Sequence, residues 1–159
     1  MRIGIGYDIH PLKKGLKLVL GGVPIRHSMG LAGHSDADAL LHAILDAVLG
    51  AMGDGDIGEL FPDTDKRFKG VSSLIFAAEV LKRLRKKKLS IGHIDSTVIA
   101  QAPRLSPYKV RMRETIARAF GLTASRVGVK AKTNEGFGSV GRKRAIMCLA
   151  VVSLKEVRR

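Results

Sequence analysis

Residues 35–49 combine the spacing of a core helix with a row of polar side chains. Apolar residues recur every three or four positions, which predicts a helix from Ser35 to about Leu49 with an apolar stripe of Leu41, Ile44, Leu45 and Val48. Asp38, His42 and Asp46 are four residues apart each time, so they line a different face. Ser35 and Asp38 resemble a capping box that uses Asp in place of Glu. The chain is therefore expected to bury one face of this helix and to present the other to polar groups.

Two further candidate ligands lie near the N-terminus. Residues 2–10 alternate as a strand, on which Asp8 and His10 point to the same face. Together with His42 they supply two imidazoles and one carboxylate, a typical protein ligand set for a catalytic zinc ion whose fourth position takes a substrate oxygen. The alternative reading is a hydrogen-bonded pair at the end of a strand, and both readings stay open at this point.

Three more polar residues fit chemistry on an anion. His34 precedes the N-terminus of a helix, where free N–H groups favour anions, and it can donate to a phosphate oxygen. Thr133 precedes the glycine-rich segment 134–141 and could supply a hydroxyl, and Glu135 within that segment could supply a carboxylate for a second metal ion. The plainer alternatives are a loop histidine and a turn at the end of a strand.

The order of elements predicts one domain, residues 1–159. Residues 50–70 read as an acidic loop, and Gly21, Gly22 and Pro24 mark a turn or bulge. Strands are expected at 2–10, 16–20, 91–101, 127–133 and 144–154, and helices at 35–49, 72–87 and 106–121. In the second helix the residues expected to point inward are Leu74, Ala77, Ala78, Leu81 and Leu84. The expected fold is a single α/β layer, a mixed sheet with helices on one face.

The formal net charge of +14 favours polyanionic ligands such as nucleic acid, membrane phosphates or a diphosphate. Its densest run, residues 82–88, ends a helical pattern, where cations complement the helix terminus. No aromatic residue interrupts this run, which argues against a surface that stacks bases. A solvated basic face is the favoured interpretation.

No stretch approaches the roughly 20 apolar residues that a membrane span requires. The only cysteine, Cys148, lies in an apolar run. Its side chain is expected to be buried, and the protein is expected to reside in a reducing compartment. Strand 2–10 begins almost at once, without a leader ahead of it. A cytoplasmic protein is expected, or a mature plastid form.

Five blocks of sequence, in order, resemble the 2-C-methyl-D-erythritol 2,4-cyclodiphosphate synthase family of the non-mevalonate isoprenoid pathway. The resemblance runs from Arg2 to about Leu154 without an obvious gap. The blocks are Gly4–His10, His34–Asp38 with His42, Gly55–Asp65, Ala100–Pro103, and Lys130–Glu135 followed by Gly141 and Arg142. Together they are far more specific than any one of them.

The resemblance implies a metal-dependent lyase. It would close 4-diphosphocytidyl-2-C-methyl-D-erythritol 2-phosphate to the cyclic diphosphate and release CMP. It also implies a homotrimer whose sheets face the three-fold axis and whose active sites lie between subunits. The implied partner is this small cytidine diphosphate substrate, with no nucleic acid and no membrane.

The resemblance also implies a role for each matching residue. Asp8, His10 and His42 would hold zinc, Glu135 would hold a second divalent cation (Mg or Mn), and His34 and Thr133 would stabilise the transition state. The residues implied for the methylerythritol phosphate part are Ser35, Asp56, Ile57, Gly58, Phe61, Asp63 and Asp65. Those implied for the cytidine and diphosphate parts are Ala100, Pro103, Arg104, Leu105, Ser106, Ala131, Lys132, Asn134 and Arg142.

The chain departs from the family pattern in three places. Arg104 stands where lysine is usual, which keeps the charge but changes its reach. Lys132 flanks Thr133 where small hydroxyl residues are common. Lys143, Arg144 and Ala145 replace a usual Gly-Glu-Gly, so the trimer axis is expected to bind anions more strongly than in other members.

Two other functions remain as alternatives. A zinc hydrolase would need a general base near the open metal position, for which the sequence offers only His34. A nucleic-acid-binding module rests on the charge alone. The cyclisation needs no strong base, because the attacking 2-phosphate is already anionic, and what it needs is alignment and charge stabilisation.

Overall fold

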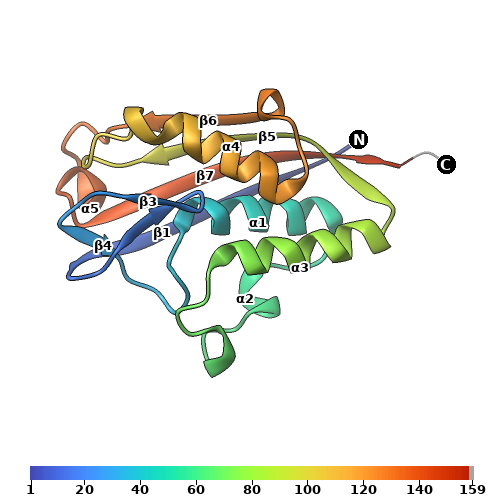
Figure 1. Ribbon diagram of the computed structural model, residues 1–159, viewed down its shortest axis with the longest axis horizontal. Coiled ribbons are helices and arrows are strands. Elements are labelled where there is room, and N and C mark those ends of the chain that lie inside the picture. The colour runs from blue at the N-terminus through green and yellow to red at the C-terminus, as the bar shows by residue number, and fades with distance from the viewer. Residues whose placement is uncertain (158–159) are drawn as a thin grey trace.

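A five-stranded mixed sheet forms the centre of the structure, a computed structural model that describes residues 1–157 (Figure 1). The strands are β1 (Arg2–Lys14), β2 (Leu18–Leu20), β3 (Val23–Ile25), β4 (Met29–Leu31), β5 (Leu89–Ile99), β6 (Val127–Lys132) and β7 (Ala145–Glu156). The order in the sheet is β4-β1-β7-β5-β6. Only the pair of β5 and β6 is parallel, while β2 and β3 form a separate antiparallel pair.

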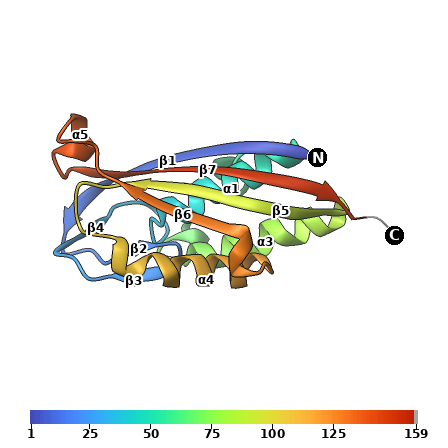
Figure 2. The same cartoon turned by 90° about the horizontal axis from the view of Figure 1, so that it is seen from above.

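Three long helices cover one face of this sheet, as Figure 2 shows: α1 (Ala39–Met52), α3 (Ser73–Lys86) and α4 (Lys109–Phe120). Two single-turn helices, α2 (Ile57–Leu60) and α5 (Gly138–Gly141), lie in the connections. Within residues 1–157, every helix is too short or too polar to cross a bilayer. The predicted mixed sheet with helices on one face is confirmed.

Strand β1 reverses the usual pattern of an amphipathic strand. Its inward positions are Gly4 and Gly6, both buried under α1. A Cβ at Gly6 would lie 1.9 Å from the main-chain oxygen of Ala43, and one at Gly4 would lie 2.0 Å from that of Ala47. Glycine is therefore required for the helix to approach the strand this closely.

The apolar side chains in the first half of β1 point away from the helices. Ile3 is 63% exposed, Ile5 72% and Tyr7 51%. Leu149 and Val151 of β7, which pair with Tyr7 and Ile5, continue the same apolar surface. Contiguous apolar area of this kind marks an interaction surface.

Helix α1 begins later than predicted. Ala37 has a φ of 53°, which interrupts the helical path, and the N-cap is Asp38, whose side chain accepts from the N–H of Leu41. The prediction of a helix starting at Ser35 with a capping box is therefore wrong. The predicted apolar stripe is buried, but so are most other side chains of α1, because the sheet and the neighbouring helices surround it.

Asp38 stabilises the fold through hydrogen bonds and does not form part of a polar helix face. It is fully buried, and its carboxylate also accepts from the N–H groups of Gly21 and Gly22 at 2.8 and 2.6 Å. These glycines form the predicted turn, which the structure resolves as the hairpin between β2 and β3 with Pro24 on β3. The short strand β4 was not predicted.

The second predicted helix is confirmed with nearly the expected bounds, and Ser72 caps it. Its buried face is turned slightly from the prediction, because Phe76 and Val80 are buried while Ala78 is exposed. The basic run 82–88 spans the last turns of this helix and has mostly exposed side chains, with Arg83 and Lys87 paired to Asp54.

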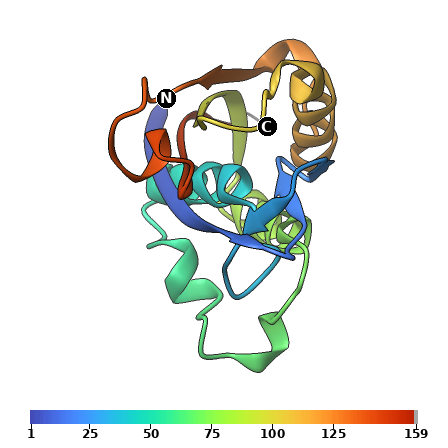
Figure 3. The same ribbon diagram turned by 90° about the vertical axis from the view of Figure 1, so that its left-hand side faces the viewer.

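The predicted acidic loop 50–70 is partly helical. Asp56 caps α2, and Asp65 caps a 3₁₀ turn at Lys66–Phe68. The glycine-rich segment likewise contains α5, and further 3₁₀ turns lie at Ser106–Tyr108 and Ala124–Arg126. Short turns of this kind carry no apolar periodicity, so the sequence pattern misses them. Figure 3 shows the segment with α2 projecting below the helices.

Cys148 is buried in β7, as predicted, and burial raises the pKa of its thiol well above the usual value. The thiolate is therefore disfavoured, which fits a structural cysteine.

Gly6→Ala should destabilise the protein by roughly 3 kcal/mol, because the new methyl group displaces main-chain atoms of α1. Gly50→Ala is the matched control, since Gly50 lies within α1 with open space around it. The control should gain up to about 1 kcal/mol from helix propensity. Urea unfolding monitored by circular dichroism measures both. Equal stability of the two variants would refute the close-approach argument.

Candidate metal centre and adjoining pocket

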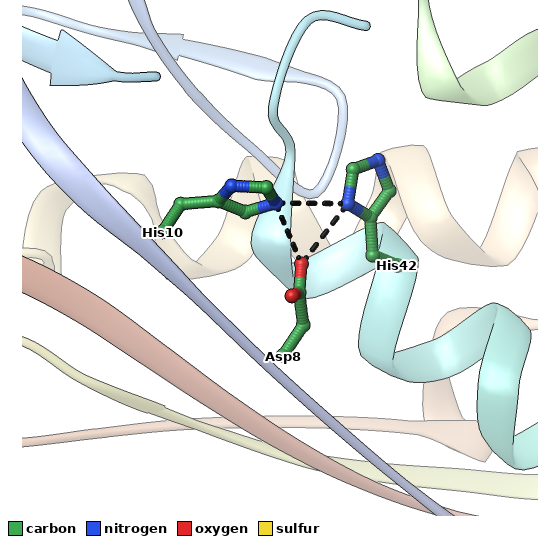
Figure 4. Close-up of side chains that lie close together, drawn as sticks. All are labelled: Asp8, His10 and His42. Carbon is green, nitrogen blue, oxygen red and sulfur yellow. Dashed lines mark hydrogen bonds and ion pairs between the residues drawn. The ribbon is translucent and has the colours of Figure 1, made fainter. Parts of the chain in front are cut away.

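Three ligand atoms from β1 and α1 converge on one point (Figure 4). The carboxylate Oδ2 of Asp8 lies 2.9 Å from Nε2 of His10 and 3.0 Å from Nδ1 of His42. The two ring nitrogens are 3.2 Å apart. Asp8 and His10 share a strand face and His42 comes from the helix packed on it, so the predicted triad is brought together. It forms a potential site for a divalent metal ion.

The other nitrogen of His10 fixes how its ring is protonated. Nδ1 lies 3.0 Å from the carbonyl oxygen of Ala32, which can only accept a hydrogen bond. Nδ1 therefore carries a proton, and Nε2 turns its lone pair toward Asp8 when the ring is neutral. Gly33 leaves room for the ring, since a Cβ there would lie 2.9 Å from Cε1 of His10.

The donor set fits a small divalent cation. With ligand bonds of about 2.0–2.1 Å, the donor atoms of a tetrahedral zinc ion lie about 3.3 Å apart, so the three observed separations need to open by only a few tenths of an ångström. Lone pairs that converge this closely repel one another unless a proton or a metal cation lies among them. Two imidazoles and one carboxylate leave a fourth position open.

The pKa values of Asp8 and His10 depend on one another. Burial raises the pKa of Asp8, but hydrogen bonds from His10 and His42 outweigh it and hold the pKa well below its usual range. Burial lowers the pKa of His10, and the hydrogen bond and charge of Asp8 outweigh it in turn, so this pKa is raised above 6.5. Without a metal ion, and below this raised pKa, the protonated His10 forms an ion pair with Asp8.

A pocket of about 250 Å³ adjoins the triad. His10 and His42 line one side, and the predicted residues that line the rest are His34, Ser35, Ile57, Gly58, Phe61 and Asp63. Phe61 stacks on Phe76 at a centroid distance of 4.3 Å, and Phe68 packs edge-on against both. Phe68 and Phe76 were not predicted as site residues, because only the fold brings them to Phe61.

Asp56 and Asp65 have roles in shaping the loop. The Asp56 carboxylate caps α2, and Asp65 forms a bidentate ion pair with Arg67. The carbonyl oxygen of Asp65 lies 2.8 Å from Nε2 of His34, which donates to it. Neither carboxylate lines the pocket, so the structure places these two predicted residues around it.

The remaining predicted residues lie elsewhere on the chain, at the end of the molecule that carries α5 (Figure 1). The Thr133 hydroxyl donates to the carboxylate of Glu135, a residue with a φ of 47°. The loops 100–106 and 133–136 are joined through Gln101, whose side-chain oxygen accepts from the N–H groups of Asn134 and Gly136. Gln101 was not predicted as a site residue, although it lies within a resembling block.

The cytidine-side residues differ in exposure. Arg104, Ser106, Lys132 and Arg142 are exposed, Ala131 and Pro103 are half-buried, and Ala100 is buried. The side chain of Leu105 is 4% exposed and belongs to the core, which leaves its backbone for any ligand contact. Within one chain, none of these residues lines the pocket beside the triad.

Zinc binding to the metal-free protein should release a proton at pH 6.5, because His10 holds one below its raised pKa and the metal ion must displace it. The zinc Kd should then rise by up to about tenfold for each pH unit of acidification. Calorimetry in buffers of different ionisation enthalpy measures the release. Asp8→Asn removes the group that raises the pKa of His10, so NMR titration of this variant should show a lower value. An unchanged value would contradict the assignment.

Comparison with known proteins agrees with this geometry. Residues 1–155 match the model of the YgbB family. A protein of Halothermothrix orenii named 2-C-methyl-D-erythritol 2,4-cyclodiphosphate synthase is 51% identical over 158 residues, which cover 99% of this chain and 96% of the relative.

Two solved structures share the fold. The bifunctional IspDF of Campylobacter jejuni superposes with a TM-score of 0.94 at 41% identity over 98% of this chain, which spans 42% of that longer protein. A Plasmodium falciparum IspF complex with CDP superposes with a TM-score of 0.87 at 38% identity, covering 99% of this chain and 97% of that one. The resemblance inferred from the five sequence blocks is thus confirmed: the chain belongs to the YgbB family, that of the 2-C-methyl-D-erythritol 2,4-cyclodiphosphate synthases.

Proposed function

We propose that residues 1–159 form one enzyme domain that converts 4-diphosphocytidyl-2-C-methyl-D-erythritol 2-phosphate to 2-C-methyl-D-erythritol 2,4-cyclodiphosphate and CMP. An oxygen of the 2-phosphate attacks the β-phosphorus. The bond from the β-phosphorus to the oxygen that bridges the two phosphates then breaks, and CMP leaves with that oxygen. The observation that carries the proposal is the convergence of Asp8, His10 and His42 beside a pocket lined by residues of the family's blocks.

The pocket suits the methylerythritol phosphate part of this substrate. Ser35 and Asp63 line it with polar groups, and Gly58 adds a backbone N–H in the first turn of α2, whereas the N–H of Ile57 is donated to the carboxylate of Asp46 at 2.8 Å. Phe61 with its aromatic neighbours closes the apolar side. Such a pocket can hold the 2-phosphate in line with the diphosphate, and alignment of this kind is a large part of the barrier reduction.

Zinc is the proposed ion for the triad, and it would supply Lewis-acid stabilisation of the charge on the phosphate under attack. Glu135 is the proposed ligand of a second divalent cation, Mg or Mn. His34 and Thr133 are proposed to donate hydrogen bonds to the transition state. The cytidine-side residues are proposed to bind the nucleotide, a role supported by the CDP complex of the Plasmodium falciparum relative.

A homotrimer with the sheets facing its axis accounts for two observations. The first is the apolar outer face of β1 and β7, which a subunit alone leaves in water. The second is the separation of Thr133 and Glu135 from the pocket beside the triad within one chain, which is expected if each active site combines two subunits. We also propose that the enzyme is cytoplasmic. The exposed residues Arg142, Lys143 and Arg144 are proposed to attract anions at the trimer axis.

Phosphorus NMR of the purified protein with the substrate, Zn²⁺ and Mg²⁺ should show CMP and a cyclic diphosphate. Asp8→Asn should lower the rate at least about 100-fold, because charge stabilisation worth several kcal/mol is lost. Glu79→Gln is the matched control, as it removes an exposed carboxylate that pairs with Lys82 on α3, and it should keep the activity. CMP with a linear product would indicate a zinc hydrolase and overturn the proposal.

Ile5→Glu should dissociate the trimer, because it places a charge on the surface proposed to be buried between subunits. The variant should sediment as a monomer, lose turnover and still bind zinc. Ile75→Glu is the matched control, since Ile75 is 61% exposed on α3, on the helical side of the sheet. Analytical ultracentrifugation distinguishes the two. An Ile5→Glu trimer with normal activity would place the assembly surface elsewhere.

A further inference from the structure

The second ring nitrogen of His42 leads away from the triad to two residues with no assigned role. In Figure 4, Nδ1 of His42 faces Asp8 and His10, while the other nitrogen of the ring, Nε2, points away from them. Nε2 lies 2.9 Å from the hydroxyl oxygen of Ser73. Ser73 is fully buried and is the first residue of α3. Its hydroxyl in turn lies 2.5 Å from Oδ1 of Asp36.

The direction of these hydrogen bonds is fixed by chemistry. A carboxylate has acceptors only, so the single hydroxyl proton of Ser73 is donated to Asp36. The oxygen of Ser73 can then only accept from the imidazole, which places the ring proton of His42 on Nε2. When the ring is neutral, Nδ1 is then left with a free lone pair, which is what a metal ligand requires, whereas a second ring proton on Nδ1 is donated to Asp8 at 3.0 Å.

A second contact holds Asp36 in place for this purpose. Its Oδ2 accepts from the backbone N–H of Ser73 at 3.0 Å, and Oδ1 accepts weakly from the N–H of Asp38 at 3.3 Å. The carboxylate therefore accepts hydrogen bonds from both the main chain and the side chain of Ser73. These hydrogen bonds connect the start of α3 to the turn that precedes α1.

A competing hydroxyl shows why the carboxylate matters. Ser35 lies 3.2 Å from the same nitrogen of His42, and its oxygen accepts from the N–H of Ala37 at 3.3 Å. Within residues 1–157, the Ser35 hydroxyl contacts no carboxylate, so its proton can turn toward Nε2. That arrangement would put the ring proton on Nδ1 and block the metal position.

We propose that Ser73 and Asp36 are positioning residues that hold His42 in the tautomer whose Nδ1 binds the metal ion. In His10, the carbonyl oxygen of Ala32 holds the ring proton on Nδ1, which leaves Nε2 as the ligand atom. Groups that orient a ligating histidine in this way typically change metal affinity by 10–100-fold when removed. The inference rests on the proposed metal site but not on the proposed reaction.

Zinc affinity, measured by competition with a chromophoric chelator, tests the proposal. Ser73→Ala and Asp36→Asn should each raise the zinc Kd by about 10–100-fold. Ser73→Thr retains the hydroxyl and should stay within about threefold of the wild type. Ser72→Ala is the matched control: Ser72 is the exposed neighbour that caps α3 through the N–H of Leu74, so this variant should also keep the affinity.

A double-mutant cycle separates positioning from a merely structural role. If Asp36 acts on His42 through the Ser73 hydroxyl, Asp36→Asn should change the zinc Kd far less in a Ser73→Ala background than alone. An effect of the same size in both backgrounds would overturn the relay. Asp36→Asn also keeps the test decisive if Ser73→Ala fails to fold.

Histidine ¹⁵N NMR of the zinc-loaded protein provides a second readout. In the wild type, Nε2 of His42 should carry a proton that exchanges slowly with water, and in Ser73→Ala this exchange should speed up at least about tenfold. A proton equally protected in both proteins would overturn the proposal. Wild-type protein that fails to bind zinc would overturn the metal site as well, whereas zinc binding without turnover would reject the proposed reaction alone.

Discussion

The structure depends on the close approach of α1 to β1. At Gly4 and Gly6 the main chain of the helix occupies the space where side chains of the strand would normally lie. The same strand face continues to Asp8 and His10, and the same helix carries His42. Because the two elements touch backbone to backbone at one end, these short and medium side chains meet at the other end. A larger spacing between the elements would leave the three donor atoms too far apart for one ion.

This contact also explains why the register of β1 is strict. A shift by one residue would move Ile3 and Ile5 under the helix and send Asp8 and His10 to the opposite face, since side chains alternate along a strand. The isoleucines do not fit where the glycines lie. Steric exclusion at the glycines thus protects the geometry of the ligands several residues away.

Much of the candidate metal site could be predicted from local spacing alone. Asp8 and His10 are two apart on a strand, His42 lies on an apolar helix, and each spacing fixes a side-chain direction without knowledge of the fold. The roles of Asp38 and Asp36 could not be predicted this way. Asp38 is part of the helical spacing of His42 and Asp46, yet its partners are Gly21 and Gly22, which only the tertiary structure brings near. Asp36 and Ser73 are likewise 37 residues apart in sequence.

The exposed isoleucines of β1 have a consequence for a single subunit. In most small proteins, tighter folding removes apolar side chains from water, but here Ile3 and Ile5 stay outside however well the subunit folds, because the backbone of α1 fills the space beneath. Stability of the subunit and its solubility are therefore separate properties. Mutations that strengthen the core would leave the tendency to adhere to surfaces or to other chains unchanged, and a newly made copy would stay adhesive until another molecule covers this face.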